Sequence, residues 1–180
     1  MEADWEFDIG ANSAVIDSLW SGRVDLRRWP DRAEELTEAE QLAGLAEALS
    51  ALNGPSSPVW TSKCDVWDAE VEFDADELGA EASSAAFVTA CYIDLLPSRP
   101  GVWATAEAVS DWCRGLRGSL QVEQLGRCRV DLVIRSALVG PGGSEFGVTA
   151  YVLGCGESRQ GALAQLSKAV GVFAAVVAGS

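Results

Sequence analysis

The stretch from Cys128 to Val177 restricts the fold more than any other part of the chain. From Cys128 to Arg135, and again from Phe146 to Val152, apolar residues largely alternate with polar or charged ones. Alternation with a period of two is typical of a strand that buries one face. Because a Gly- and Pro-rich segment at 140–144 separates the two runs, we predict an antiparallel hairpin.

A long helix is expected after this hairpin. Gly154, Cys155 and Gly156 are residues of a tight turn, and Ser158 is suited to cap a helix. Apolar residues then recur at steps of three and four: Leu163, Leu166, Val170, Phe173 and Val177. From Val170 to Ala178 no charged residue appears. We therefore expect the helix to pack on the sheet and also to meet a second chain or the N-terminal elements. A homodimer through this C-terminal helix is one prediction.

Three patterns in the N-terminal third predict further elements. Residues 5–9 alternate like a short strand, and residues 15–20 have the spacing of one or two helical turns. Residues 38–52 carry a leucine stripe behind a capping-box pattern that starts at Thr37, which predicts one continuous helix.

The middle of the chain contributes two strands and a helix. Residues 59–67 predict a strand in which Trp60 and Cys64 share a face. The apolar phase then slips by one residue, which indicates either a bulge near Val66 and Trp67 or two separate strands. Residues 86–96 are apolar on both sides, which predicts an interior strand. Residues 102–116 predict an amphipathic helix that ends at one of the two glycines near position 115.

Together these patterns favour a single α+β domain over residues 1–180, with a largely antiparallel sheet and helices packed on one face. Residues 1–57 supply N-terminal elements and the first long helix, and residues 58–180 supply the sheet and two helices. From residue 86 onward the order is strand, helix, strand, strand, helix. This is a ferredoxin-like order that lacks its last strand, and the strand at 59–66 is a candidate for that place.

The charge is strongly negative. There are 13 Lys and Arg residues against 27 Asp and Glu residues, a formal net charge of -14. A field of this sign repels phosphate backbones, so neither nucleic acid nor an anionic membrane is an expected partner. It accelerates encounter with a basic protein or a cation. The alternative is that the charge only keeps a compact protein soluble. A run of acidic residues at 70–77 is interpreted as a solvated loop.

The side-chain inventory argues against most catalytic chemistry. The chain has no histidine, which removes the commonest general base and metal ligand. Its five cysteines are far apart and form no CxxC pair, so no metal or cofactor site is predicted. With no apolar leader at the N-terminus, these features favour the reducing cytoplasm. Cys155 before a helix is a nucleophile without a base, so no catalytic residue is assigned.

Two candidate binding sites remain. The first is the polar face of the predicted sheet, where Tyr and Arg side chains gather with acidic ones. The second is the Trp-flanked segment at 60–67, since Trp is a frequent interface anchor. The candidate binding residues are Trp60, Lys63, Asp65, Trp67, Tyr92, Asp94, Arg129, Asp131, Arg135 and Tyr151.

The leading hypothesis is therefore a small acidic protein that binds other proteins, in its most specific form an immunity-type inhibitor of a basic partner. The alternative is a small-molecule-binding protein or enzyme that uses the polar sheet face. A third interpretation is a structural dimer without a ligand.

Overall fold

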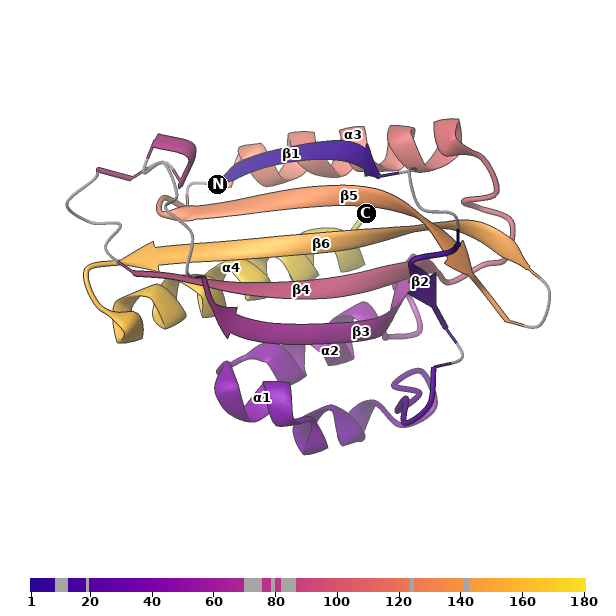
Figure 1. Ribbon diagram of the computed structural model, residues 1–180, viewed down its shortest axis with the longest axis horizontal. Helices are drawn as coiled ribbons and strands as arrows, with labels where there is room; N and C mark the ends of the chain where they lie inside the picture. Colours follow the sequence, from indigo (N-terminus) through magenta and orange to yellow (C-terminus); the bar gives the residue numbers. More distant parts are fainter. Residues whose placement is uncertain are drawn as a thin grey trace.

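The computed structural model describes residues 1–8, 13–18, 20–69, 76–78, 80–81, 87–123, 125–140 and 143–180. These residues form a single α+β domain in which one sheet carries helices on one of its faces (Figure 1). The predicted fold class is confirmed. The predicted acidic run at 70–77 lies mostly outside the described residues.

The elements are as follows. The strands are β1 (Glu2–Asp8), β2 (Ile16–Asp17), β3 (Val59–Asp68), β4 (Phe87–Pro97), β5 (Cys128–Leu138) and β6 (Ser144–Gly156). The helices are α1 (Thr37–Gln41), α2 (Leu45–Leu52), α3 (Ala106–Gln121) and α4 (Arg159–Ala178), with two 3-10 helices, η1 (Pro30–Glu35) and η2 (Asp76–Leu78).

The sheet has the order β1-β5-β6-β4-β3, with β2 beside the end of β5. β1 and β2 run parallel to β5, and all other neighbours are antiparallel. From β4 onward the elements follow in the order that the sequence predicts, and β3 lies beside β4 at the sheet edge. β4 is an interior strand, as its two apolar faces indicate.

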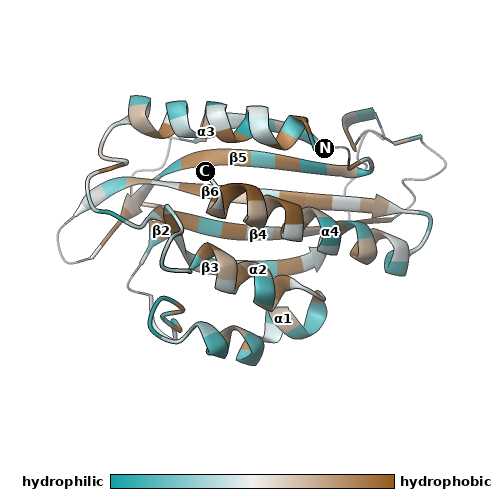
Figure 2. Ribbon diagram, turned by 180° about the vertical axis from the view of Figure 1, so that it is seen from behind, coloured by the Kyte–Doolittle hydropathy of each residue, from teal (hydrophilic) through white to brown (hydrophobic). Residues whose placement is uncertain are grey.

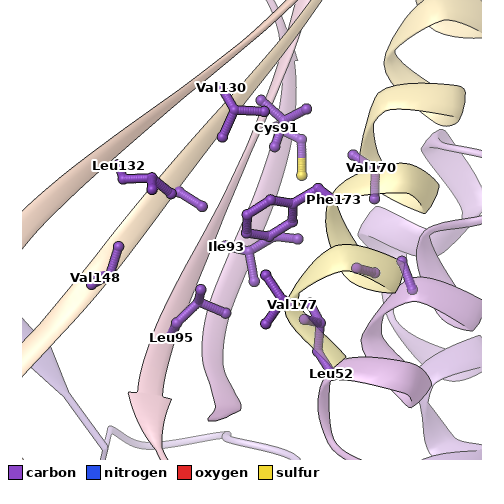
Figure 3. Packing of buried hydrophobic residues seen from close by; sticks show 14 of the residues in the cluster. Leu52, Cys91, Ile93, Leu95, Val130, Leu132, Val148, Val170, Phe173 and Val177 are labelled. Carbon is purple, nitrogen blue, oxygen red and sulfur yellow. The ribbon is translucent and has the colours of Figure 1, made fainter. Parts of the chain in front are cut away.

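The core lies between the sheet and the helix layer. Figure 2 shows α4 across the middle of the sheet, with α3 and α2 on either side. In Figure 3, Phe173 and Val177 of α4 face Ile93 of β4, and Leu52 of α2 closes the cluster. All four side chains are fully buried. Their burial stabilises the fold by about 1.5–3 kcal/mol for each large apolar side chain.

α4 lies unusually close to β6, and glycine makes this approach feasible. A Cβ atom on Gly154 would lie 2.4 Å from the backbone nitrogen of Leu166. The sequence predicts a tight turn here, but β6 continues through Gly156 before the chain reverses. Ser158 then caps α4 as predicted, because its side chain accepts a hydrogen bond from the amide of Gly161 at 3.1 Å.

α4 meets the N-terminal elements through α2, one of the two partners that its apolar composition predicts. By length and composition α4 is also long and apolar enough to cross a membrane. Here it buries Leu166, Val170 and Phe173 against the sheet, as the core helix of a compact domain does. The homodimer remains a prediction.

The continuous helix predicted for residues 38–52 is wrong. α1 ends at Gln41, Leu42 is extended (φ -128°, ψ 110°), and Gly44 takes a left-handed conformation with φ +82° before α2 begins. The Thr37 side chain makes no capping hydrogen bond, since Leu36 is the residue that precedes the helix. The break lets Leu42 and Leu45 both reach the core, where they are fully buried.

The helical turns predicted at 15–20 are also wrong for the described part of that segment. Ile16 and Asp17 form β2, and the amide of Val15 donates to the carbonyl of Ser136 at 2.9 Å. Ile16, one of the apolar residues behind that prediction, instead packs against the sheet. Ile16 sits over Gly147, where an added Cβ would lie 2.7 Å from the Cδ1 atom of Ile16.

The bulge of β3 exists but lies earlier than predicted. The pairing with β4 shifts between Thr61 and Cys64, so that Ser62 and Lys63 face the single residue Asp94. Trp60 and Cys64 consequently lie on opposite faces, contrary to the prediction. The helix predicted at 102–116 starts later, at Ala106, and runs through both glycines to Gln121.

Candidate functional site

We call the sheet face opposite the helices the open face, and among the described residues its covers lie at the two ends of the strands. At one end the segment around β2 crosses it, and Ile16 packs with Trp60, Leu96 and Ala137. At the other end Leu78 of η2 packs on Val88, Ala90, Leu153 and Cys155. Between these two covers the open face carries polar and aromatic side chains, and we call this strip, which crosses the strands, the channel.

The segment around β2 is held by the bulge of β3. The hydroxyl of Ser62 donates to the carbonyl of Asp17, and the indole N–H of Trp20 donates to the carbonyl of Ser62, both at 3.1 Å. The extra residue of a bulge turns backbone groups away from the ladder, which makes them available for such contacts. The bulge therefore fixes one wall of the channel.

One row of residues crosses the open face from edge to edge. Register pairs Asp4 with Asp131, Asp131 with Tyr151, Tyr151 with Tyr92, and Tyr92 with Asp65. We call these five residues the transverse row. Register partners present their side chains on the same face, so this row has carboxylates at both ends and two tyrosines in its middle.

The middle of the row is an aromatic cluster. The ring of Trp67 lies 6.2 Å from that of Tyr92 and 6.4 Å from that of Tyr151, and the two tyrosine rings are 6.3 Å apart. These separations are those of tilted and edge-to-face aromatic pairs. Trp67 remains 37% exposed, so the cluster offers apolar area to a ligand.

Two arginines flank the row, and each is engaged with a carboxylate. The Nε of Arg129 donates to both oxygens of Asp131 at 2.8 and 2.9 Å. The Nε of Arg135 lies 3.3 Å from the carboxylate of Asp8. Its Nη1 donates to the Tyr151 hydroxyl at 3.2 Å. These contacts hold the guanidinium groups in place and neutralise part of the local charge.

Burial changes the acidity of three groups on this face. Burial raises the pKa of Tyr92 to about 12, with Asp94 and Asp65 adding to the effect, so its hydroxyl is a hydrogen-bond donor at neutral pH. Burial also raises the pKa of Asp94, although the hydrogen bond from Thr149 opposes this. The pKa of Asp131 is raised by burial as well, against the opposing hydrogen bond from Arg129.

Two clefts lie on either side of the aromatic cluster. The larger, of about 570 Å³, is lined by Glu6, Arg129, Asp131, Tyr151, Leu153 and Trp67 among others. The smaller, of about 310 Å³, lies at the β3 edge and is lined by Trp20, Glu38, Lys63, Cys64, Asp65 and Tyr92 among others. Both clefts therefore combine carboxylates with aromatic walls.

The structure brings most of the predicted binding residues together. Nine of them lie on or beside the open face, namely Lys63, Asp65, Trp67, Tyr92, Asp94, Arg129, Asp131, Arg135 and Tyr151. Asp94 is buried, with 6% of its surface exposed, so it supports the face rather than presenting a charge. Trp60 is buried under the covered end, and the guanidinium groups of Arg27 and Arg23 stack on its ring at 4.0 and 4.8 Å.

The sequence analysis predicted a short strand at residues 5–9, which overlaps β1, but it did not count the acidic face of this strand as a candidate site. Its residues Glu2, Asp4, Glu6 and Asp8 all pair with the β5 positions that face the open side. The strict acidic alternation in residues 2–8 was the available signal. The carboxylate of Glu6 has no ion-pair partner among the described residues.

The site has little that resembles catalytic machinery. Cys155 is fully buried beneath Leu78, and burial raises the pKa of its thiol. Within the part of the chain that the structure describes, no group of three or more Cys, Asp or Glu side chains is placed to hold a metal ion. The arrangement is suited to holding a cationic or aromatic group by contact.

Comparison of the chain with protein-family models, with curated proteins and with solved structures gave no match.

Proposed function

We propose that this protein binds a basic protein partner, which it receives on the open face. The single observation that supports this most directly is the transverse row, in which carboxylates stand on both sides of an aromatic cluster. Aromatic residues are frequent anchors of protein interfaces. The formal net charge of -14 extends the same sign over the whole molecule, which steers a basic partner toward it.

In its most specific form, the protein is an immunity-type inhibitor that covers the basic surface of a partner such as a nuclease toxin. Acidic inhibitors of this class act through complementary charge, and the open face offers such a surface. We place the protein in the cytoplasm. In support, all five cysteines are free thiols, the state that a reducing compartment maintains.

The experiment uses fluorescently labelled deca-lysine as the probe and deca-glutamate as its acidic counterpart, with anisotropy as the readout. The test variant reverses two charges on β1, Asp4→Lys with Glu6→Lys. The matched control, Glu34→Lys with Glu40→Lys, makes the same change in net charge at exposed positions away from the open face.

We expect deca-lysine to bind the wild type and the control, with weaker binding to the β1 variant. The affinity falls as salt rises, because exposed charges are screened over about 10 Å at 0.1 M salt. Equal weakening in both variants would mean that only net charge matters, and the proposal for this face would be wrong.

The larger cleft supports a second candidate, the binding of a small molecule. Its volume of about 570 Å³ lies in the range of about 300–1,000 Å³ that is usual for ligand sites. A thermal-shift screen with neutral and cationic metabolites tests this idea. A ligand that binds there raises the melting temperature of the wild type and has a smaller effect on a Trp67→Ala variant.

A further inference from the structure

We infer that the partner enters the channel as one extended segment that crosses the strands and carries basic residues at positions i and i+4, with an apolar or aromatic residue at i+2. This inference rests on the proposed function and specifies what the open face recognises. The geometry of the transverse row supports it, together with the position of the two covers.

The direction of the segment follows from the walls of the channel. Ile16 and Leu78 close the open face at opposite ends of the strands. A segment that ran parallel to the strands would meet one of these covers. A segment that crosses them can enter at the β1 edge, pass over β5, β6 and β4, and leave at the β3 edge (Figure 1).

The spacing follows from the register. Asp131 on β5 and Asp65 on β3 are separated by three steps between neighbouring strands. Neighbouring strands lie about 4.8 Å apart, so the two backbone positions are about 14 Å apart. An extended chain rises about 3.3 Å per residue, and four residues cover the same distance.

The pattern of side chains follows from the pleat. In an extended segment, residues i, i+2 and i+4 point to the same side. A segment that directs residues i and i+4 toward the two acidic ends therefore also directs residue i+2 toward Tyr92 and Tyr151. An apolar or aromatic side chain at i+2 meets Trp67 and the two tyrosine rings there.

Each acidic end carries an exposed carboxylate, Glu6 or Asp65, that takes part in no ion pair among the described residues. At the β5 end, Glu6 shares the larger cleft with Asp131, whereas Asp4 is already paired with Arg117 at 3.6 Å and Asp131 with Arg129. At the β3 end, Asp65 is exposed and shares the smaller cleft with Glu38. Lys63 lies 5.7 Å over the ring of Trp20, which leaves the two carboxylates as acceptors.

The test compares labelled peptides of identical composition, each with two Arg, one Leu and six Ser. In the first, the order Arg-Ser-Leu-Ser-Arg places the cations at i and i+4. In the second they stand at i and i+3, which turns them to opposite sides, and in the third they are adjacent. Affinities for the wild type, Asp65→Asn and Asp31→Asn are measured by anisotropy. Asp31 is an exposed residue of η1 and serves as the control of equal charge.

We expect the i, i+4 peptide to bind the wild type about fivefold more tightly than either isomer, the effect of one additional exposed ion pair. Asp65→Asn removes this preference and Asp31→Asn retains it. If all three isomers bind equally while reversal of Asp4 and Glu6 still weakens binding, the extended crossing segment is wrong and the basic partner stands. If no basic probe binds, the proposed function itself fails, and this inference with it.

Discussion

Asp94 of β4 and Thr149 of β6 are cross-strand partners, and the threonine hydroxyl donates a 2.6 Å hydrogen bond to the buried carboxylate. Burial raises the pKa of Asp94 above its ordinary value. Ionised Asp94 is thus less favourable in the folded state than in the unfolded chain. The ionised carboxylate therefore lowers the stability of the protein. This loss is absent at pH values below the pKa of Asp94 in the unfolded chain, and it appears as the pH rises through the pKa of the folded state.

An Asp94→Asn variant should therefore gain stability relative to the wild type as the pH increases from about 4. The asparagine oxygen still accepts the hydrogen bond from Thr149, and the buried charge is gone. Denaturant unfolding at a series of pH values measures the difference. A difference in unfolding free energy that shrinks with rising pH would contradict the prediction.

Asp25 should show the opposite dependence. Hydrogen bonding from Arg27 lowers the pKa of Asp25, and Arg23 and Arg27, its ion-pair partners, both stack on Trp60. A carboxylate whose pKa is lowered by folding stabilises the protein at pH values above its pKa in the unfolded chain. This stabilisation is lost as the pH falls through the pKa of the folded state. We expect Asp25→Ala to reduce the unfolding free energy by about 1 kcal/mol or less at pH 7.

The loss from Asp25→Ala should disappear in acid, because the wild-type carboxylate is then protonated as well. Asp31→Ala, at an exposed position of η1, is the control. Denaturant melts at pH 7 and near pH 3 separate the two cases. A loss that is the same at both pH values would show that Asp25 acts through packing and not through its charge.

Two glycine substitutions should act in opposite directions. Gly154→Ala places a Cβ 2.4 Å from the backbone of α4, so either α4 or β6 must move, at a cost of about 2 kcal/mol or more. Gly171→Ala lies on the exposed side of α4 with nothing within 4 Å of the new Cβ. It should stabilise the protein by about 0.5–1 kcal/mol. Thermal unfolding of both variants checks the pair, and a neutral Gly154→Ala would show that α4 is not held at this distance.

The cysteines should react slowly with thiol reagents in the native protein. Burial raises the pKa of Cys64 to about 12, with Glu38 adding to the effect, so little thiolate exists at pH 8. Cys64 is nevertheless the only one that is partly exposed, since the other four are buried. We expect Cys64→Ser to remove the fastest phase of labelling and all five thiols to react after denaturation. Rapid native labelling of Cys64→Ser would contradict this.

The sequence alone predicts those elements whose signal lies within one uninterrupted stretch of the chain. Alternation in residues 128–135 and 146–152 predicted the β5–β6 hairpin, and Ser158 predicted the start of α4, because each signal lies within one short stretch of chain. The same alternation placed Tyr92, Asp131 and Tyr151 on one face once those strands were recognised.

The tertiary structure decided everything that depends on contacts between distant segments. Gly44 breaks the helix expected at 38–52. Ile16 pairs with Ala137 of β5, and its side chain occupies the space above Gly147. The position of the bulge, at Ser62 and Lys63 opposite Asp94, depends on how β3 pairs with β4. The alignment of Asp4, Asp131, Tyr151, Tyr92 and Asp65 depends on four separate strand registers. A pattern within one strand fixes which face a residue takes, and only the neighbouring strand fixes which residue stands beside it.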